Sequence, residues 1–225
     1  MVRASGKVGE AFLEILSERP FPVAEPVALA SERSAGGKVS FGDRELTLKN
    51  LAEYDFNGID IAFFSAGGAV SRVHAPRAAA AGAVVIDNTS EFRYQDDIPL
   101  VVSEINPHAI AHYTNRGIIA NPNCSTMQML VALAPIHRAV GIERINVATY
   151  QSVSGAGRSG TDELGRQTAA LLNFQEVEPE RFQAQIAFNV IPQIDDFQPN
   201  GYTQEEMKMV WETRKILEDQ SIQVN

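Results

Sequence analysis

The chain contains a single cysteine, Cys124, in the stretch NPNCST. The apolar run at 117–123 predicts a strand, and residues 125–139 predict a helix, because their apolar side chains recur at steps of three and four. At a helix start, unpaired backbone N–H groups and the helix dipole stabilise a thiolate. The same N–H groups can stabilise an oxyanion on a carbonyl that the sulfur attacks. The position therefore suits a nucleophile, although a buried structural thiol fits the spacing equally well.

A thiol nucleophile works with a general base, and the chain has four histidines. His137 lies on the same expected helix as Cys124, roughly 20 Å away at about 1.5 Å per residue, and cannot reach the thiol. His108 and His112 are four residues apart, which would suit a metal pair, but no third ligand accompanies them, so we expect no metal site. His74 is expected on the surface of another helix. The sequence thus offers a nucleophile without its base.

A second candidate site lies near the amino terminus, in SGKVGEAFLEILSER. Gly6 and Gly9 stand on either side of Lys7 and Val8 at the start of an expected helix. Glycines there let the backbone approach a pyrophosphate, and the free N–H groups of the helix attract it. The stretch ASERSAGG follows the next expected strand, where a dinucleotide-binding fold contacts the adenine ribose. Together the two stretches indicate a dinucleotide cofactor.

The choice of cofactor depends on four residues of that second stretch. Glu32 could accept a hydrogen bond from a ribose 2′-hydroxyl, as in NAD sites. Arg33, with Ser31 and Ser34, could instead hold the 2′-phosphate of NADP. We predict NADP, because an arginine beside two hydroxyl donors makes the better phosphate site. A solvated loop without a cofactor is the alternative.

Composition limits the partners. The 19 Lys and Arg against 28 Asp and Glu give a net charge of −9, and without a basic run we expect no nucleic-acid partner. The nearly uncharged segments 59–71 and 118–136 are interrupted by Gly, Pro, Asn or Ser, so no membrane partner is expected. The amino terminus lacks the apolar core of a signal peptide, and one cysteine makes no internal disulfide. A cytoplasmic location is expected, with small-molecule chemistry.

The elements that would position these residues follow an α/β order. The runs PVALAS (26–31) and IDIAFFSAGG (59–68) end in small residues, as strands of an open parallel sheet do before a ligand loop. A hairpin is predicted between them, over 36–50, and a helix after them, over 70–83. Further strands are predicted at 84–90, 100–107 and 117–123. This alternation indicates a βαβ sheet whose ligands bind beyond the strand carboxyl ends.

The second half of the chain is less regular. After the helix that begins beside Cys124, we predict a strand at 145–155, a helix at 161–172, a strand-like stretch at 185–194 and a helix at 203–219. The placement of the motifs puts a domain change near residue 123.

Eight motifs, taken in order, resemble aspartate-β-semialdehyde dehydrogenases of the bacterial type. They are SGKVGEAFLEIL, LASERSAGGKVSF, FFSAGG, DNTSEFR, VVSEINP, NPNCSTMQM, YQSVSGAG and EEMKMVWETRKIL. The resemblance covers nearly the whole chain. It implies a Rossmann-like parallel-sheet NADP-binding domain at 1–123, without its first strand, followed by an incomplete α+β catalytic and dimerisation domain at 124–225. It also implies a homodimer for the complete enzyme.

The activity that the resemblance implies is NADP-dependent reductive dephosphorylation of L-aspartyl 4-phosphate to L-aspartate 4-semialdehyde, in lysine, methionine and threonine biosynthesis. The family's chemistry passes through a cysteine thioester, so Cys124 resembles the acyl-carrying nucleophile. Asn123 resembles a residue that shapes the thiol pocket. Gln151 resembles the glutamine that orients the acyl group, a role that its amide can fill as donor or acceptor. Arg93 resembles the phosphate-binding arginine, whose planar fork suits an oxyanion.

The last helix and several loops complete the implied site. Glu205 and Lys208, three residues apart on one helix face, resemble the pair that contacts the substrate's ammonium group and the phosphate; an exposed ion pair is the alternative. The residues that resemble cofactor contacts are Ser65, Ala66, Gly67, Asn88, Ser154, Gly155, Ala156 and Gly157.

The chain departs from the family's pattern at both ends. Only MVRAS precedes the glycine turn, and Arg3 stands where its first glycine is expected, so the chain is truncated or its cofactor site is damaged. The family's catalytic histidine and substrate-carboxylate arginine lie beyond a Val-Asn pair like Val224-Asn225, so we expect little or no turnover from these residues alone. An N-acetyl-glutamyl-phosphate reductase-like enzyme and a non-catalytic scaffold or interface remnant are the alternatives.

Overall fold

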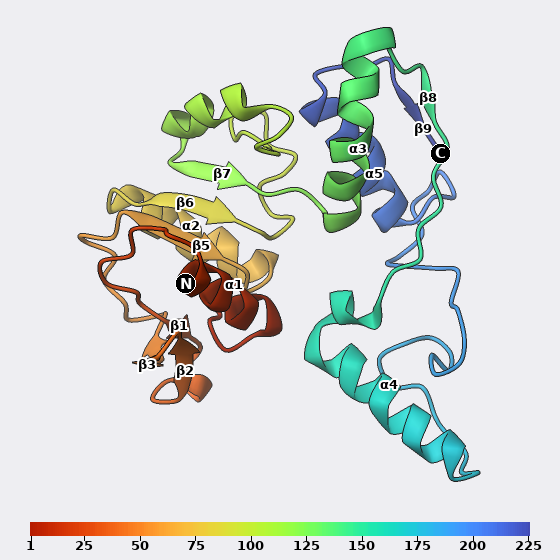
Figure 1. Cartoon of the computed structure of the whole chain (residues 1–225), viewed down its shortest axis with the longest axis horizontal. Coiled ribbons are helices and arrows are strands. Elements are labelled where there is room, and N and C mark those ends of the chain that lie inside the picture. Colours follow the sequence, from red (N-terminus) through yellow and green to blue (C-terminus); the bar gives the residue numbers. More distant parts are fainter. The chain divides into compact units, whose positions relative to one another are not determined.

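The computed structural model describes all 225 residues, which divide into two compact units. Unit 1 comprises Met1–Asn146 and Lys208–Asn225, and unit 2 comprises Val147–Met207. Figure 1 shows the order of the elements along the chain. The domain boundary between residues 123 and 124 stays a prediction. No helix combines the length and the apolar character that a membrane span requires.

Unit 1 is built on a parallel sheet. Its strands are β1 (Leu29–Ala30), β4 (Lys49–Asn50), β5 (Ile61–Phe64), β6 (Val84–Asp87) and β7 (Ile118–Ala120). β5, β6 and β7 are neighbours in that order, and β1 pairs with β4. Val2 joins the two groups, because it forms parallel bridges to both Leu29 and Phe64. The α/β fold with a parallel sheet, predicted from the sequence, is confirmed.

The strand order reverses at Val2. The chain passes from Val2 to β1 and β4 on one side, and then returns to β5, β6 and β7 on the other. In open α/β sheets, ligands bind beyond the strand carboxyl ends at such a point of reversal. The turn at residues 3–6, which directly follows Val2, therefore lies where a nucleotide is expected.

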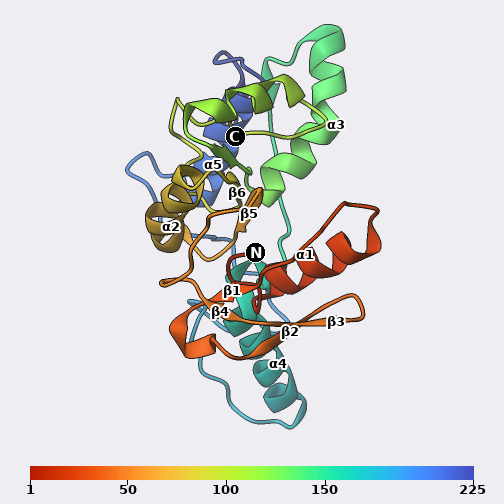
Figure 2. The same ribbon diagram turned by 90° about the vertical axis from the view of Figure 1, so that its left-hand side faces the viewer.

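Helices and a hairpin cover this sheet. Helix α1 (Lys7–Glu18) packs against the antiparallel hairpin of β2 (Lys38–Phe41) and β3 (Arg44–Thr47), as Figure 2 shows. The hairpin turns alternate residues inward, so that Val39, Phe41 and Leu46 join Leu13 of α1 in one apolar cluster. The remaining elements of unit 1 are η1 (Glu32–Ser34), α2 (Gly68–Ala80), η2 (Pro107–Asn115), α3 (Cys124–Val140), β8 (Arg144–Ile145), β9 (Gln223–Val224) and most of α5 (Gln204–Ile216).

Unit 2 has less regular structure. Its elements are η3 (Val153–Ala156), α4 (Gly157–Leu172) and the first turn of α5. Glu163, on α4, accepts hydrogen bonds from the backbone N–H groups of Glu180 (3.0 Å) and Arg181 (2.6 Å). Gln167, one turn further on, accepts from the N–H groups of Ile186 (2.9 Å) and Ala187 (3.1 Å). Two polar side chains thus hold the long segment after α4 against the helix.

Three predicted strands are wrong. Segment 100–107 forms only a single bridge, between Leu100 and Ala120. The side chain of Asn106 takes the backbone groups that a neighbouring strand would bind, since it accepts from Val102 N (2.9 Å) and donates to Leu100 O (2.9 Å). The prediction at 145–155 yields only β8, which pairs with β9. Segment 185–194 forms turns, and its backbone is bound by the side chain of Gln167 instead.

Candidate functional site

Cys124 is exposed and is the first residue of α3, directly beyond the carboxyl end of β7. The residue before it, Asn123, is the helix N-cap. Its Oδ1 accepts from the backbone N–H groups of Ser125 (2.9 Å) and Thr126 (3.4 Å), which satisfies two donors at the helix start. The thiol therefore stands at a capped helix N-terminus, the position that the sequence predicted for a nucleophile.

Arg93 is buried in the loop after β6, and its guanidinium is held on two sides. Nη1 donates to Glu212 Oε1 at 3.0 Å, and Nη2 donates to the backbone oxygen of Asn88 at 3.1 Å. Its buried Nε has no hydrogen-bond partner. The backbone oxygen of Arg93 accepts from Lys215 Nζ at 3.0 Å. Arg93 is thus fixed through both its side chain and its main chain.

The loop that carries Arg93 is closed by Lys215, on α5. Its Nζ also donates to the backbone oxygens of Gln95 (2.6 Å) and Ile98 (3.0 Å). Burial lowers the pKa of Lys215, although the carboxylates of Asp96 and Asp97 oppose that shift. One ammonium group therefore binds three carbonyl groups of a single loop.

Glu212 connects this loop with the residue before the thiol. Its Oε2 accepts from Asn123 N at 2.6 Å, while its Oε1 accepts from Arg93 and from the hydroxyl of Tyr94 at 3.2 Å. Sequence reasoning missed Glu212 and Lys215. A signal was present for the first of them, because Glu212 occupies the same buried helix face as Met209 and Ile216. A carboxylate on a buried helix face between apolar residues is expected to have a specific hydrogen-bond or ion-pair partner.

The end of β6 adds a second buried carboxylate. Asp87 accepts from the hydroxyls of Ser71 (2.8 Å) and Thr89 (2.7 Å). Burial raises the pKa of Asp87, and these hydroxyls oppose the shift only in part. The following residue, Asn88, accepts through Oδ1 from Asn121 Nδ2 at 2.7 Å. The structure therefore links two predicted site positions, Asn88 and the loop of Cys124, through Asn121.

The glycine turn opens the carboxyl edge of the sheet. Gly9 of α1 allows close packing there, because a Cβ atom would lie 2.3 Å from Arg3 O and 2.7 Å from Ala4 O. Gly6 is the N-cap of α1 and has no side-chain cap. Arg3 has a φ of 62°, in the left-handed region that favours glycine. The exposed Lys7 and Val8 lie in the first turn of α1. This free helix start fits the pyrophosphate of a dinucleotide.

Other predicted cofactor residues lie beyond neighbouring strands of this edge. Ser31, Arg33 and Ser34 lie at η1, directly after β1, with Ser31 and Arg33 exposed. Ser65, Ala66 and Gly67 follow β5, and Asn88 follows β6. Backbone contact joins the last two groups, since Asn88 N donates to Phe64 O at 2.8 Å. The carboxyl edge thus gathers groups that can bind a nucleotide along its length.

The remaining predicted residues lie in unit 2, except Lys208, which belongs to unit 1. Gln151 Nε2 donates to Glu205 Oε1 at 3.3 Å, so the structure brings these two predicted site residues together. Glu205 is buried, and Lys208 follows it by three residues on α5. Ser154, Gly155 and Ala156 form most of η3, and Gly157 begins α4 with a φ of 77°.

The histidines have partners away from the thiol. His74 Nδ1 contacts Arg77 Nη1 at 2.6 Å, and His108 Nε2 contacts Glu218 Oε1 at 2.8 Å. His137 Nδ1 accepts from the backbone N–H of Ile142 at 3.1 Å. The structure contains no group of three or more His, Cys, Asp and Glu side chains arranged to hold a metal ion.

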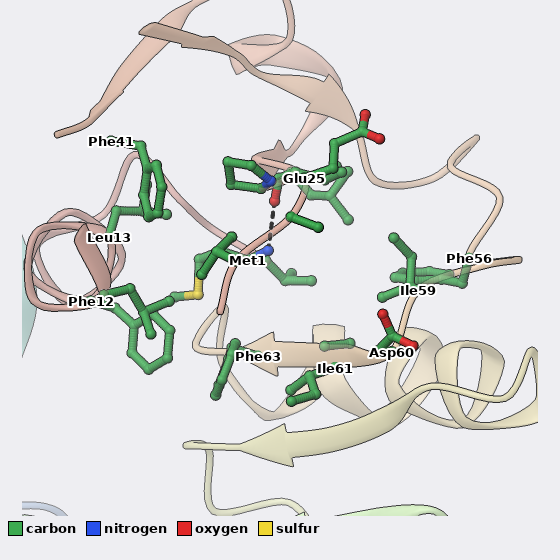
Figure 3. Close-up of a pocket in the computed structure, with 18 of the residues that line it drawn as sticks. Met1, Phe12, Leu13, Glu25, Phe41, Phe56, Ile59, Asp60, Ile61 and Phe63 are labelled. Carbon is green, nitrogen blue, oxygen red and sulfur yellow. Dashed lines mark hydrogen bonds between the residues drawn. The ribbon is translucent and has the colours of Figure 1, made fainter. Parts of the chain in front are cut away.

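A pocket of about 490 Å³ lies at the opposite, amino-terminal edge of the sheet (Figure 3). Aromatic and aliphatic side chains line it together with Met1, whose N donates to Val27 O at 2.7 Å. The labelled aromatic residues are Phe12, Phe41, Phe56 and Phe63. Because nucleotides bind at the carboxyl edge of such sheets, this pocket is separate from the candidate cofactor site.

Comparisons with known proteins give the class. Residues 1–113 match the model of the semialdehyde dehydrogenase NAD binding domain, and residues 133–225 match that of the semialdehyde dehydrogenase dimerisation domain. These two domains define a semialdehyde dehydrogenase with a nicotinamide-nucleotide-binding domain. The chain belongs to the aspartate-semialdehyde dehydrogenase family.

Three relatives illustrate the match. Aspartate-semialdehyde dehydrogenase 2 of Vibrio cholerae is 64% identical over 222 residues, which are 99% of this chain and 66% of that protein. The crystal structure of aspartate semialdehyde dehydrogenase II from Vibrio cholerae, complexed with ASA, has a TM-score of 0.98 at 62% identity and covers 100% of this chain and 67% of that one. The enzyme of Candida albicans, crystallised with NADP, has a TM-score of 0.71 at 25% identity, over 99% and 64% of the two chains. This chain therefore spans about two thirds of the length of these relatives.

Proposed function

We propose that the chain carries the thiol-bearing and nucleotide-binding parts of an NADP-dependent aspartate-semialdehyde dehydrogenase. The reaction is the conversion of L-aspartyl 4-phosphate to L-aspartate 4-semialdehyde, a step toward lysine, methionine and threonine. The observation that carries the proposal is the exposed thiol of Cys124 at the start of α3, capped by the buried Asn123. The family membership supports the choice of reaction.

The proposed chemistry uses Cys124 as the acyl carrier. The sulfur attacks the acyl carbon, the bond from that carbon to the phosphate oxygen breaks, and phosphate leaves with the electron pair. The first N–H groups of α3 stabilise the oxyanion that forms on the carbonyl. A bound NADPH supplies the hydride that brings the resulting thioester to the oxidation level of the aldehyde. Release of the aldehyde returns the electron pair to sulfur.

The remaining residues bind and orient in this proposal. Arg93 holds the phosphate, which its unpartnered Nε and its remaining N–H groups support. Gln151 orients the acyl group. Glu205 and Lys208 contact the substrate's ammonium group and the phosphate. Gln151 and Glu205 already share a hydrogen bond in unit 2, which supports a common task.

Cofactor binding is proposed at the carboxyl edge of the sheet. Gly6 and Gly9 would hold the pyrophosphate, and Arg33, with Ser31 and Ser34, would hold the 2′-phosphate of NADP. Residues 154–157 would contact the nicotinamide. The free start of α1 and the close packing at Gly9 support this placement. The Candida albicans relative crystallised with NADP supports the choice of cofactor.

Calorimetry with NADP and NAD tests the cofactor. We expect Arg33→Gln to weaken NADP binding about tenfold or more, because the 2′-phosphate loses a charged donor. NAD binding, which lacks that phosphate, should stay unchanged. Equal loss for both cofactors would place Arg33 outside the 2′-phosphate site, and no binding of either would contradict the cofactor proposal.

A homodimer is also proposed. Unit 2 exposes apolar side chains, and residues 133–225 match the dimerisation model. The most exposed are Tyr150, Leu172, Phe174, Phe188, Val190 and Phe197. A second copy that covers them would remove this surface from water. Sedimentation of the chain measures the assembly, and a monomer at all concentrations would contradict it.

Protection of the thiol tests the substrate. Aspartate semialdehyde should slow alkylation of Cys124 by iodoacetamide, because the sulfur adds to the aldehyde carbon and the proton moves to its oxygen, which masks the thiol. N-acetyl-glutamate semialdehyde should protect only at higher concentration. The reverse order would favour an N-acetyl-glutamyl-phosphate reductase. Alkylation no faster than that of glutathione, with no protection, would favour a non-catalytic scaffold.

A further inference from the structure

Glu212 is a carboxylate whose side chain has 0% exposure. A buried charge is costly unless hydrogen bonds and an opposite charge compensate it. Glu212 lies on the buried face of α5 with Met209, Thr213 and Ile216. An apolar residue would pack there without that cost, so the carboxylate is kept for the contacts that it makes.

Every partner of Glu212 is a donor. Oε2 accepts from Asn123 N at 2.6 Å, and Oε1 accepts from Arg93 Nη1 at 3.0 Å and Tyr94 Oη at 3.2 Å. A carboxylate offers only acceptors, and both of its oxygens are used on different segments of the chain. A glutamine of the same size would turn an NH₂ group toward one of the two N–H partners. The site therefore requires a carboxylate rather than a polar group of that shape.

One of these segments sets the position of the thiol. Asn123 is held from both sides, since Glu212 binds its backbone N–H while its own side chain binds Ser125 and Thr126. Its φ and ψ of −60° and 143° turn the chain from β7 into α3. Cys124 follows directly, so the contact to Glu212 fixes the peptide from which the thiol projects.

The other segment carries the anion-binding arginine of the proposed function. Glu212 holds the side chain of Arg93, and Lys215, three residues further along the same helix face, holds its backbone oxygen. Helix α5 thereby fixes Arg93 by two independent contacts. The same helix fixes Asn123 through the second oxygen of Glu212.

We propose that Glu212 is a positioning residue, which holds the nucleophile loop and the anion-binding arginine in register through the two oxygens of one carboxylate. This inference rests on the proposed roles of Cys124 and Arg93. The fitting substrate has an acyl carbon and an anionic group at a fixed separation, so one rigid connection between the two binding elements serves the reaction.

Alkylation of the full chain with two reagents tests this role. Cys124 is the only thiol, so rates with neutral iodoacetamide and anionic iodoacetate report on it alone. We expect Glu212→Gln to slow iodoacetamide about tenfold, because the N-cap loosens and the helix start no longer stabilises sulfur. The ratio of the iodoacetate rate to the iodoacetamide rate should rise severalfold, since Arg93 loses its neutralising partner.

Glu163→Gln is the matched control. Glu163 is also a buried helix carboxylate that accepts two backbone N–H groups, but it holds the segment after α4. Its replacement should leave both alkylation rates within twofold of the unmodified chain. The inference is overturned if Glu212→Gln changes neither the rates nor the ratio, or if Glu163→Gln reproduces its effect.

A second measurement applies if Glu212→Gln fails to fold. In the unmodified chain, the backbone amide of Asn123 should exchange its hydrogen at least tenfold more slowly than that of Cys124, which has no intrahelical acceptor as the first helix residue. Exchange of the Asn123 amide hydrogen as fast as that of Cys124 would contradict the proposal. The proposed function is tested separately. It is contradicted if Cys124 of the unmodified chain reacts no faster than glutathione. The alkylation rates of the variants can still be compared when the thiol reacts slowly.

Discussion

The two units of the chain use their apolar side chains in opposite ways. Every residue of the two apolar core clusters belongs to unit 1, where Phe64, Leu130 and Ile216 are fully buried. In unit 2, by contrast, Phe174 is 100% exposed, and Phe188 and Val190 are also exposed. Unit 2 is held instead by hydrogen bonds that the side chains of Glu163 and Gln167 accept from backbone N–H groups.

Unit 1 therefore has two apolar clusters of its own, and neither cluster includes a residue of unit 2. Unit 1 buries two apolar clusters within the chain, although Val73 and Val140 of the same unit are exposed, and burial of that kind is the main stabilising contribution in folding. Unit 2 leaves comparable side chains in water, as a surface that meets another polypeptide does. Unit 2 lies within the match of residues 133–225 to a dimerisation domain, which also includes parts of unit 1.

The largest predicted effect compares one core residue with one exposed residue. Leu130→Ala should lower the free energy of unfolding by about 3–4 kcal/mol, because it leaves a cavity at a position with 0% exposure. In the monomer, Phe174→Ser should change it by less than about 0.5 kcal/mol, since the ring is 100% exposed there. Urea unfolding at a concentration where sedimentation shows a monomer measures both. A comparable loss at Phe174 in the monomer would contradict the contrast between the units.

An intermediate effect is predicted within helix α4 of unit 2. At Gly160 a Cβ atom would lie 2.7 Å from Val153 O and 2.8 Å from Ala156 Cβ, whereas at Gly165 it meets open space. Gly160→Ala should therefore cost about 2 kcal/mol, and Gly165→Ala should stabilise by up to about 1 kcal/mol through helix propensity. Thermal unfolding distinguishes them. Equal and small effects would mean that η3 does not pack on α4.

The smallest effect is a pH dependence in unit 1. Burial raises the pKa of Asp87 above its unfolded value of about 3.9. The folded chain then binds the proton more tightly, so the contribution of Asp87 to stability is favourable at low pH and is lost as pH rises through the folded pKa. The stability of the unmodified chain relative to Asp87→Asn should fall from about pH 4 toward neutrality. A difference that stays constant or grows with pH, in urea unfolding at stepped pH, would contradict this.

Local pattern was enough to predict much of unit 1. The parallel strands around Leu29, Phe64 and Ile118, the hairpin after β1 and the helix after Asn123 all have apolar periodicities that packing preserves. The strand predicted at 100–107 failed because the Asn106 side chain replaces a ladder partner, and side-chain bonds of this kind compete with secondary structure. The spacing of apolar residues gives no information on whether a side chain will bind the backbone in place of a neighbouring strand.

Contacts within the candidate site could be predicted from sequence pattern only between residues that are adjacent in sequence. Cys124 and its cap are adjacent in sequence, so NPNCST was enough to predict a thiol at a helix start, while its role stays a prediction. Glu212 is 89 residues from Asn123, and no pattern in the sequence joins them. Its position among the apolar residues of α5 could have marked Glu212 as unusual. Its hydrogen-bond partners, however, could be identified only from the fold. The hydrogen bond between the predicted site residues Gln151 and Glu205 of unit 2 likewise became known only from the structure.

The long separation between Asn123 and Glu212 also has a consequence for biosynthesis. A ribosome adds about 5–20 residues per second, so the thiol emerges roughly 4–20 seconds before the carboxylate that holds its loop. During that interval Arg93, Asn123 and the carbonyl groups bound by Lys215 have no partner on α5. The residues that hold the nucleophile loop are therefore complete only once α5 has been made.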